Sequence, residues 1–173
     1  ILLTAFGLAA NNIFKVNELL IDLEGHGRED ILSDIDVGRT VGWFTSIYPV
    51  VLEVGYQDNL AYQIKTVKEC LRKVPNKGIG FGILKYLTDE KHTNGVSFEY
   101  QPQLVFNYLG QVDGNVEQLS MDIAAEPSGF TISPEGNREH ELVITAIVIK
   151  KQLRASVSYS DQQFKDETMK ALI

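Results

Sequence analysis

The hydrophobic and polar residues of this chain follow patterns that predict both helices and strands. Residues 1–14 are rich in Leu and Ala and predict a buried helix. Polar and apolar residues alternate within 16–24, which predicts a strand. Residues 40–54 are β-branched and aromatic and predict an extended segment, in which Pro49 favours an edge strand or a bend.

The middle of the chain predicts a helix followed by a glycine turn. Asp58 is expected to cap a helix that runs to about Val74, because the apolar residues between them recur on one helical face. Pro75 ends this helix. The three glycines within 78–82 predict a tight turn that leads into a short helix at 83–87.

The C-terminal part of the chain predicts three strands and a last helix. Residues 103–109 alternate and predict one strand, and residues 140–149 and 152–159 predict a hairpin. Ser160 and Gln163 have the spacing of a capping box, which favours a final helix directly after the hairpin.

These elements predict a layered α/β domain with a mixed, partly antiparallel sheet and flanking helices. The 173 residues are enough for one domain with its own core, so 1–173 is treated as a single unit. Residues 112–137 are polar and show no clear period, and a segment that long without a period is often functional.

Composition and charge exclude several classes of protein. Hydrophobic residues make up 44% of the chain, which excludes a disordered protein. The net charge of -7, with no basic block, argues against nucleic acid and anionic membranes as partners. Cys70 is the one cysteine, so neither an intrachain disulfide nor a cysteine-based zinc site is expected.

The two ends suggest a piece of a longer chain. The first residues are apolar but too few to span a bilayer, and they lack the basic start of a signal peptide. The last residues end inside a predicted helix. We therefore expect a fragment of a cytoplasmic protein.

Residues 24–29, Glu-Gly-His-Gly-Arg-Glu, carry the most chemistry of any segment. They follow a predicted strand, where active sites are often built. Glu24 is either a general acid or base, or a structural carboxylate paired with Arg28 or a lysine. His26 either titrates near neutrality or holds the loop through hydrogen bonds. Arg28 and Glu29 are interpreted as a pair that fixes the loop.

The other candidate residues have plain structural interpretations when taken one by one. Asn107 and Tyr108 lie on a predicted strand and are typical of a half-buried position. His92 and His140 have no partner in the sequence, and no two histidines have the spacing of metal ligands. The glycines of 78–82 match neither a dinucleotide fingerprint nor a P-loop.

Five segments in order, however, resemble one family, the epimerization domains of non-ribosomal peptide synthetases. The matching motifs are Leu2–Gly7, Glu24–Glu29, Arg39–Pro49, Pro75–Gly82 and Phe106–Gln111. The second motif matches in full, whereas Phe81 stands in the fourth motif where Tyr is usual. The related condensation domains usually carry Gly-x-Phe-Val-Asn-Thr where this chain has Gly42-Trp43-Phe44-Thr45.

The resemblance implies a fold and a missing half. Epimerization domains have two lobes of the chloramphenicol-acetyltransferase type, and the first carries His-His-x-x-x-Asp-Gly with a catalytic second His. That string does not occur here, so the chain resembles the second, C-terminal lobe. Residues 112–137 would then fit a crossover segment toward the first lobe. The isolated lobe is expected to be inactive.

The resemblance also implies a reaction. The family inverts the α-carbon of an aminoacyl or peptidyl thioester carried on the phosphopantetheine arm of a peptidyl carrier protein, and it binds no cofactor directly. Glu24 would be one proton-transfer group, and Tyr108 would hydrogen-bond the intermediate or relay a proton. His26, Arg28, Trp43, Asn107 and Gly80 would support the loop or shape the tunnel. Two rivals stay open: a condensation-type acyltransferase lobe and a non-catalytic module that docks carrier proteins.

Overall fold

The computed structural model describes residues 1–31, 33–55, 59–93, 95–112, 126–127, 129, 133 and 135–173. The helices are α1 (Leu2–Phe14), α2 (Leu60–Arg72), α3 (Ile79–Tyr86) and α5 (Asp166–Leu172), with 3-10 turns η1 (Pro75–Gly78) and η2 (Glu90–His92). The strands are β1 (Glu18–Gly25), β2 (Ser46–Glu53), β3 (Leu104–Gln111), β4 (Leu142–Ile149) and β5 (Gln152–Ser158).

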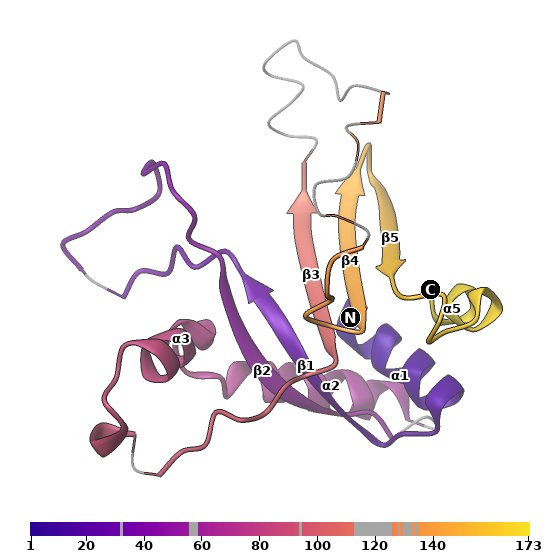
Figure 1. Ribbon diagram of the computed structural model, residues 1–173, viewed down its shortest axis with the longest axis horizontal. Coiled ribbons are helices and arrows are strands. Elements are labelled where there is room, and N and C mark those ends of the chain that lie inside the picture. Colours follow the sequence, from indigo (N-terminus) through magenta and orange to yellow (C-terminus); the bar gives the residue numbers. More distant parts are fainter. Residues whose placement is uncertain are drawn as a thin grey trace.

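The strands form one mixed sheet in the order β2-β1-β3-β4-β5. The outer pairs β1–β2 and β4–β5 are antiparallel, and the inner pairs β1–β3 and β3–β4 are parallel. The contact between β1 and β3, here called the β1–β3 joint, has two residue pairs, Asp22 with Val105 and Leu23 with Phe106. Beyond it the two strands diverge toward their C-terminal ends (Figure 1).

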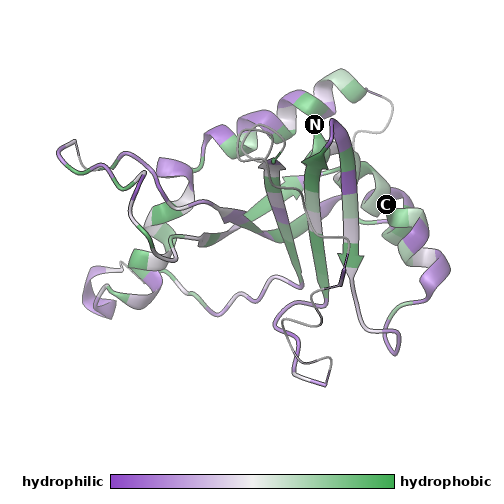
Figure 2. Cartoon of the chain, turned by 90° about the horizontal axis from the view of Figure 1, so that it is seen from above, coloured by the Kyte–Doolittle hydropathy of each residue, from purple (hydrophilic) through white to green (hydrophobic). Residues whose placement is uncertain are grey.

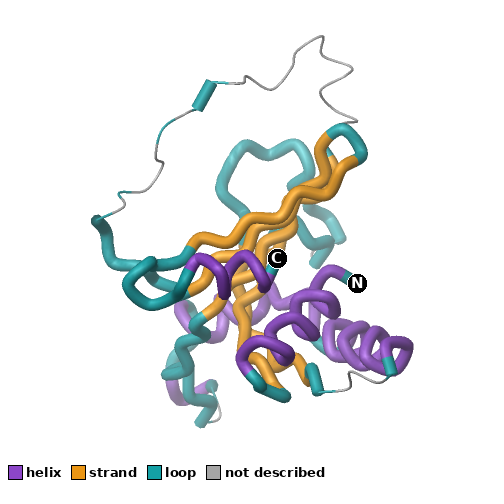
Figure 3. Tube along the Cα trace, turned by 90° about the vertical axis from the view of Figure 1, so that its right-hand side faces the viewer, coloured by secondary structure: helices purple, strands orange, loops and turns teal. Residues whose placement is uncertain are grey.

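One face of the sheet is covered by helices and contains the core. Alternation along β1 directs Ile21 and Leu23 to this face, where they pack with residues of α1, α2 and α5. Phe6 of α1 lies 6.3 Å from Phe106 of β3, measured between ring centroids. Figure 2 shows a long helix along one side of the strands and loops on the opposite side, and Figure 3 shows the helices at both chain ends close to the strands. We call the other side the open face.

The predicted strands and the first helix are confirmed, and the mixed sheet with flanking helices matches the predicted fold class. The extended segment predicted over 40–54 is wrong at its start, because β2 begins at Ser46. The hairpin prediction is confirmed by the antiparallel register of β4 and β5. The crossover prediction for 112–137 falls mostly on residues that lie outside the described ranges.

The predicted caps of two helices differ from the structure or fall outside the described residues. Asp58 lies outside them, and α2 is capped instead by Asn59, whose side chain accepts a hydrogen bond from the Tyr62 N–H. Ser160 does not cap a helix: its hydroxyl accepts from the Gln162 N–H in a turn, and α5 begins only at Asp166.

The predicted glycine turn at 78–82 is also wrong, because α3 already begins at Ile79. Of the three glycines in 78–82, only Gly78 has a left-handed φ, of 82°. An added Cβ there would lie 2.1 Å from the Tyr48 ring, so both space and φ require glycine. The turn before α3 is therefore η1, and Gly80 is a helical residue.

Strand β2 is the edge strand that Pro49 predicts. Two side chains of α2 hydrogen-bond to its backbone: the Cys70 thiol donates to the Val51 carbonyl at 3.2 Å, and the Gln63 side-chain amide donates to the Glu53 carbonyl. Burial raises the pKa of the Cys70 thiol, with the Glu53 carboxylate adding to the effect, so the thiol stays a protonated donor. These bonds fix α2 against the edge of the sheet.

In the part of the chain that the structure describes, every helix is too short or too polar to cross a bilayer.

Candidate functional site

Glu24 lies near the C-terminal end of β1, one residue beyond the β1–β3 joint. Its neighbours Ile21 and Leu23 face the core, so alternation directs Glu24 to the open face. There its carboxylate accepts a hydrogen bond from the side-chain amide of Asn107 on β3. The two residues are 83 positions apart in the sequence. The structural alternative for Glu24 named Arg28 or a lysine as its partner, whereas the partner in the structure is Asn107.

A second polar pair lies on the same face, next to the first. Asp22 precedes Glu24 by two residues, and its Oδ2 lies 2.9 Å from Nε2 of His140. Both side chains are largely buried, with His140 9% exposed. Because a carboxylate only accepts, the imidazole N–H is the donor. The structural interpretation of His140 is consistent with this pair, whose other member the sequence around His140 did not indicate.

The loop after β1 is held by a network around Glu29. The His26 ring accepts a hydrogen bond from the Arg28 N–H at its Nδ1, so Nε2 carries the proton and faces Glu29 at 3.2 Å. The other Glu29 oxygen accepts from Lys77 of η1 at 2.7 Å. His26 therefore supports the loop through both of its ring nitrogens.

Arg28 does not pair with Glu29, which corrects the predicted ion pair. Its guanidinium donates to the Val37 carbonyl and lies 4.0 Å from the centroid of the Phe44 ring. Gly27 makes this fold possible: its φ is 65°, and an added Cβ would lie 1.5 Å from the Phe44 carbonyl oxygen. Gly27 and Phe44 are thus held close together, both by the tight approach of their backbones and by the Arg28 side chain, which packs on the Phe44 ring.

Tyr48 connects this loop to the covered face. Its ring packs on the η1 turn at Gly78. Burial raises the pKa of Tyr48, the Glu29 carboxylate raises it further, and Lys77 opposes both. Two of the motifs that are distant in sequence, at 24–29 and 75–82, therefore meet around Glu29, Lys77 and Tyr48.

Tyr108 does not share the position of Glu24. The regular pairing of β3 with β4 continues through Tyr108 and Ala146, so Tyr108 follows Phe106 and faces away from Asn107. It is 47% exposed. The structure thus brings Asn107, and not Tyr108, to the Glu24 carboxylate.

Two residues expected to shape the site make few contacts. Trp43 is 91% exposed, so its side chain does not pack into this lobe, and its expected role in shaping a tunnel stays a prediction. Gly80 lines an apolar groove of about 450 Å³ between β2 and α3, and an added Cβ would meet nothing within 4 Å. Neither residue contacts Glu24 through any hydrogen bond of the described chain.

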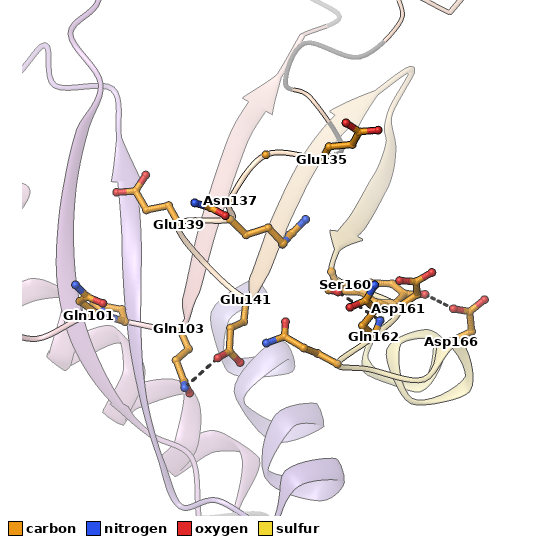
Figure 4. Close-up of a pocket in the computed structure, with 15 residues that line it drawn as sticks. Gln101, Gln103, Glu135, Asn137, Glu139, Glu141, Ser160, Asp161, Gln162 and Asp166 are labelled. Atoms are coloured by element: carbon orange, nitrogen blue, oxygen red, sulfur yellow. Dashed lines mark hydrogen bonds between the residues drawn. The ribbon is translucent and has the colours of Figure 1, made fainter.

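A larger hollow, of about 1000 Å³, lies between the segment before β4 and the segment after β5 (Figure 4). Its lining is polar and contains none of the predicted site residues. The carboxylates around it are Glu135, Glu139, Glu141, Asp161 and Asp166. Asp166 accepts from the Tyr159 hydroxyl at 2.7 Å, and Glu141 accepts from the Gln103 amide at 3.3 Å. Among the described residues, no three His, Cys, Asp or Glu side chains form a group that could hold a metal ion.

Sequence reasoning missed Asp22, and it assigned His140 and Asn107 no partners. Asp22 was visible as a charged residue inside an apolar strand, which is a signal of a buried partner. Nothing local pointed to His140, because the pair spans 118 positions.

The sequence is similar to parts of large peptide synthases. It is 44% identical over 169 residues to surfactin synthase subunit 1 of Bacillus subtilis (strain 168), covering 98% of this chain and 5% of that protein. It is also 44% identical over 180 residues to gramicidin S synthase 1 of Brevibacillus brevis, covering 99% of this chain and 16% of that protein. The chain thus spans a small part of the curated relatives it matches.

The fold matches solved structures over nearly its whole length. The epimerization domain from the third module of tyrocidine synthetase B superposes with a TM-score of 0.92 at 43% identity, covering 99% of this chain and 38% of that one. A condensation domain of the enacyloxin polyketide synthase superposes with a TM-score of 0.64 at 12% identity, which shows the fold alone. The family described as Condensation domain matches residues 1–173. The chain therefore belongs to the condensation-domain family of non-ribosomal peptide synthetases.

Proposed function

We propose that residues 1–173 form the C-terminal lobe of an epimerization domain, which inverts the α-carbon of an aminoacyl or peptidyl thioester. The observation that carries the proposal is the Glu24 carboxylate, which lies on the open face beside the β1–β3 joint and is oriented by Asn107. The 43% identity to the tyrocidine epimerization domain supports this activity over the condensation activity of other family members.

The chemistry follows from the thioester. A thioester acidifies the neighbouring C–H bond, so a positioned carboxylate can accept the α-proton and leave a planar enolate-like species. Return of a proton to the opposite face inverts the centre. Glu24 is assigned one of these two transfers. One of its oxygens is occupied by the Asn107 amide, which orients the other toward a substrate.

The second proton-transfer group is assigned to the His-His-x-x-x-Asp-Gly segment of an N-terminal lobe outside these residues. Tyr108 is kept as a candidate to hydrogen-bond the intermediate, on the strength of its exposure. Since it faces away from Glu24, proton transfer on this lobe is assigned to Glu24 alone. The substrate would arrive on the phosphopantetheine arm of a peptidyl carrier protein, and the lobe itself would bind no cofactor.

The test is loss of α-deuterium from a labelled aminoacyl carrier protein, measured with a two-lobed domain that contains these residues. Glu24→Gln is expected to slow exchange by about 10²–10⁴-fold, the usual contribution of a general acid or base. Glu18→Gln, at the exposed start of the same strand, is the matched control and keeps the wild-type rate. The isolated chain is expected to show no exchange above buffer.

Three outcomes would contradict the proposal. A loss below about tenfold, or ~1.4 kcal/mol, would make Glu24 structural. Peptide extension without a change in chirality would assign a condensation reaction instead. Binding of the carrier protein without exchange would leave a docking module.

A further inference from the structure

The β1–β3 joint has fewer paired residues than any other strand contact in the described sheet. It has two residue pairs, whereas β1 and β2 pair along eight. Glu24 lies one residue past the last pair, so strand pairing does not hold it beside Asn107. Its position relative to β3 depends on how firmly the joint is closed.

The Asp22–His140 pair spans this joint. Val105 of β3 pairs with Asp22 on one side and with Val143 of β4 on the other, and it is buried. His140 lies two residues before β4 begins and reaches Asp22 on β1, the strand beyond β3. The pair therefore links β1 to the segment just before β4, across the width of β3.

The two side-chain contacts flank the joint on one face. Asp22 and Glu24 are two residues apart on β1, so both point to the open face. The contact between Asp22 and His140 lies where Asp22 pairs with Val105. The hydrogen bond between Glu24 and Asn107 lies one residue beyond the pairing of Leu23 with Phe106. Loss of the imidazole would leave the largely buried Asp22 carboxylate without its donor, which favours movement of β1 toward water.

We propose that His140, acting through Asp22, is a positioning residue for Glu24. Its N–H holds β1 against β3, so that the Glu24 carboxylate stays within reach of Asn107 and of the substrate. This role rests on the proposed function for its effect on turnover, but its effect on the Glu24–Asn107 contact does not depend on that function.

The test compares side chains of similar chemistry and different reach. In His140→Gln the amide nitrogen can occupy the place of Nε2 and donate to Asp22. In His140→Asn the amide is too short to do so, and in His140→Leu the donor is absent. Ser158→Ala is the matched control, because it removes a hydrogen bond that ties Arg138, in the same segment, to β5 and leaves the joint intact.

In the two-lobed domain we expect kcat for α-deuterium exchange to fall at least tenfold in His140→Asn and His140→Leu, with KM changed less than twofold. His140→Gln should stay within about threefold of wild type, and Ser158→Ala should equal it. Crystal structures of the Gln and Asn variants should retain and lose the Glu24–Asn107 contact, respectively.

Equal losses in the Asn and Gln variants would overturn the proposal, as would an intact Glu24–Asn107 contact in His140→Asn. A loss in Ser158→Ala as large as that in His140→Asn would reduce His140 to general stabilisation. If His140→Leu does not fold, the Gln and Asn variants still decide. If the wild-type domain shows no exchange, the proposed function fails, and the crystallographic contact alone decides the positioning role.

Discussion

The two faces of the sheet use the same strands for different purposes. On the covered face, Ile21 and Leu52 are fully buried among apolar side chains of the helices. On the open face, Asp22, Glu24 and Asn107 form polar contacts between strands. Because side chains alternate along β1, successive residues contribute to stability and to the proposed chemistry in turn. Substitutions on the two faces should therefore separate stability from activity.

The largest effect is expected at the core, where β2 offers a matched pair of neighbours. Leu52 is 0% exposed and Val51 is 51% exposed. Leu52→Ala should lower the free energy of unfolding by about 2–5 kcal/mol, through lost burial and a cavity. Val51→Ala should cost no more than about 1 kcal/mol. Urea unfolding followed by circular dichroism measures both, and similar costs would show that the open face is as important to stability as the core.

A smaller loss of unfolding free energy is expected when either of two glycines with different surroundings, Gly78 and Gly110, is replaced by alanine. Gly78 and Gly110 have similar φ values, 82° and 78°, but only at Gly78 would a Cβ collide with another residue, Tyr48. Gly110→Ala should cost about 1 kcal/mol of unfolding free energy from backbone strain alone. Gly78→Ala should cost at least twice that, because the η1 turn must also move away from the covered face. Equal costs would mean that the Tyr48 contact is easily relaxed.

The smallest effect concerns the ion pair of Lys77 with Glu29, which joins the η1 turn to the loop after β1. The hydrogen bond from Lys77 to Glu29, and then their charges, raise the pKa of Lys77 above its usual 10.5. A raised lysine pKa stabilises the fold fully below about pH 10.5, and this stability is lost as the pH rises through the higher folded-state pKa. Lys77→Met should thus lower the melting temperature slightly at neutral pH and not at all at strongly alkaline pH.

Lys91→Met is the control for this measurement, because it removes an exposed ion pair with its near neighbour Asp89. Thermal melts in steps of pH would contradict the assignment if the difference between wild type and Lys77→Met grew as the pH rose.

Much of the fold could be predicted because its signals are local. Alternation and β-branched or aromatic composition located the strands, and of the two alternatives that Pro49 favoured, an edge strand or a bend, the edge strand is observed. The glycine turn at 78–82 failed because glycine is also tolerated in a helix that tertiary packing supports, and only Gly78 has a backbone that requires it. The capping box at Ser160 failed because the same hydrogen bonds also form in an isolated turn.

The site was less predictable because its contacts are not local. The charges of residues 24–29 suggested an internal pair of Arg28 and Glu29, whereas each has a different partner. Glu24 and Asn107 meet only because β1 and β3 are parallel neighbours, an arrangement that no local pattern specifies. The family resemblance singled out Glu24, but it did not indicate Asp22 or His140.

The edge of β2 has a further consequence, which concerns association between molecules. An edge strand normally presents free N–H and C=O groups that can template another strand and start aggregation. Along β2, alternate positions are closed to such addition: Pro49 has no N–H, and the carbonyls of Val51 and Glu53 already accept bonds from α2. The helix that completes the core therefore also protects the sheet from pairing with a second copy of the chain at this edge.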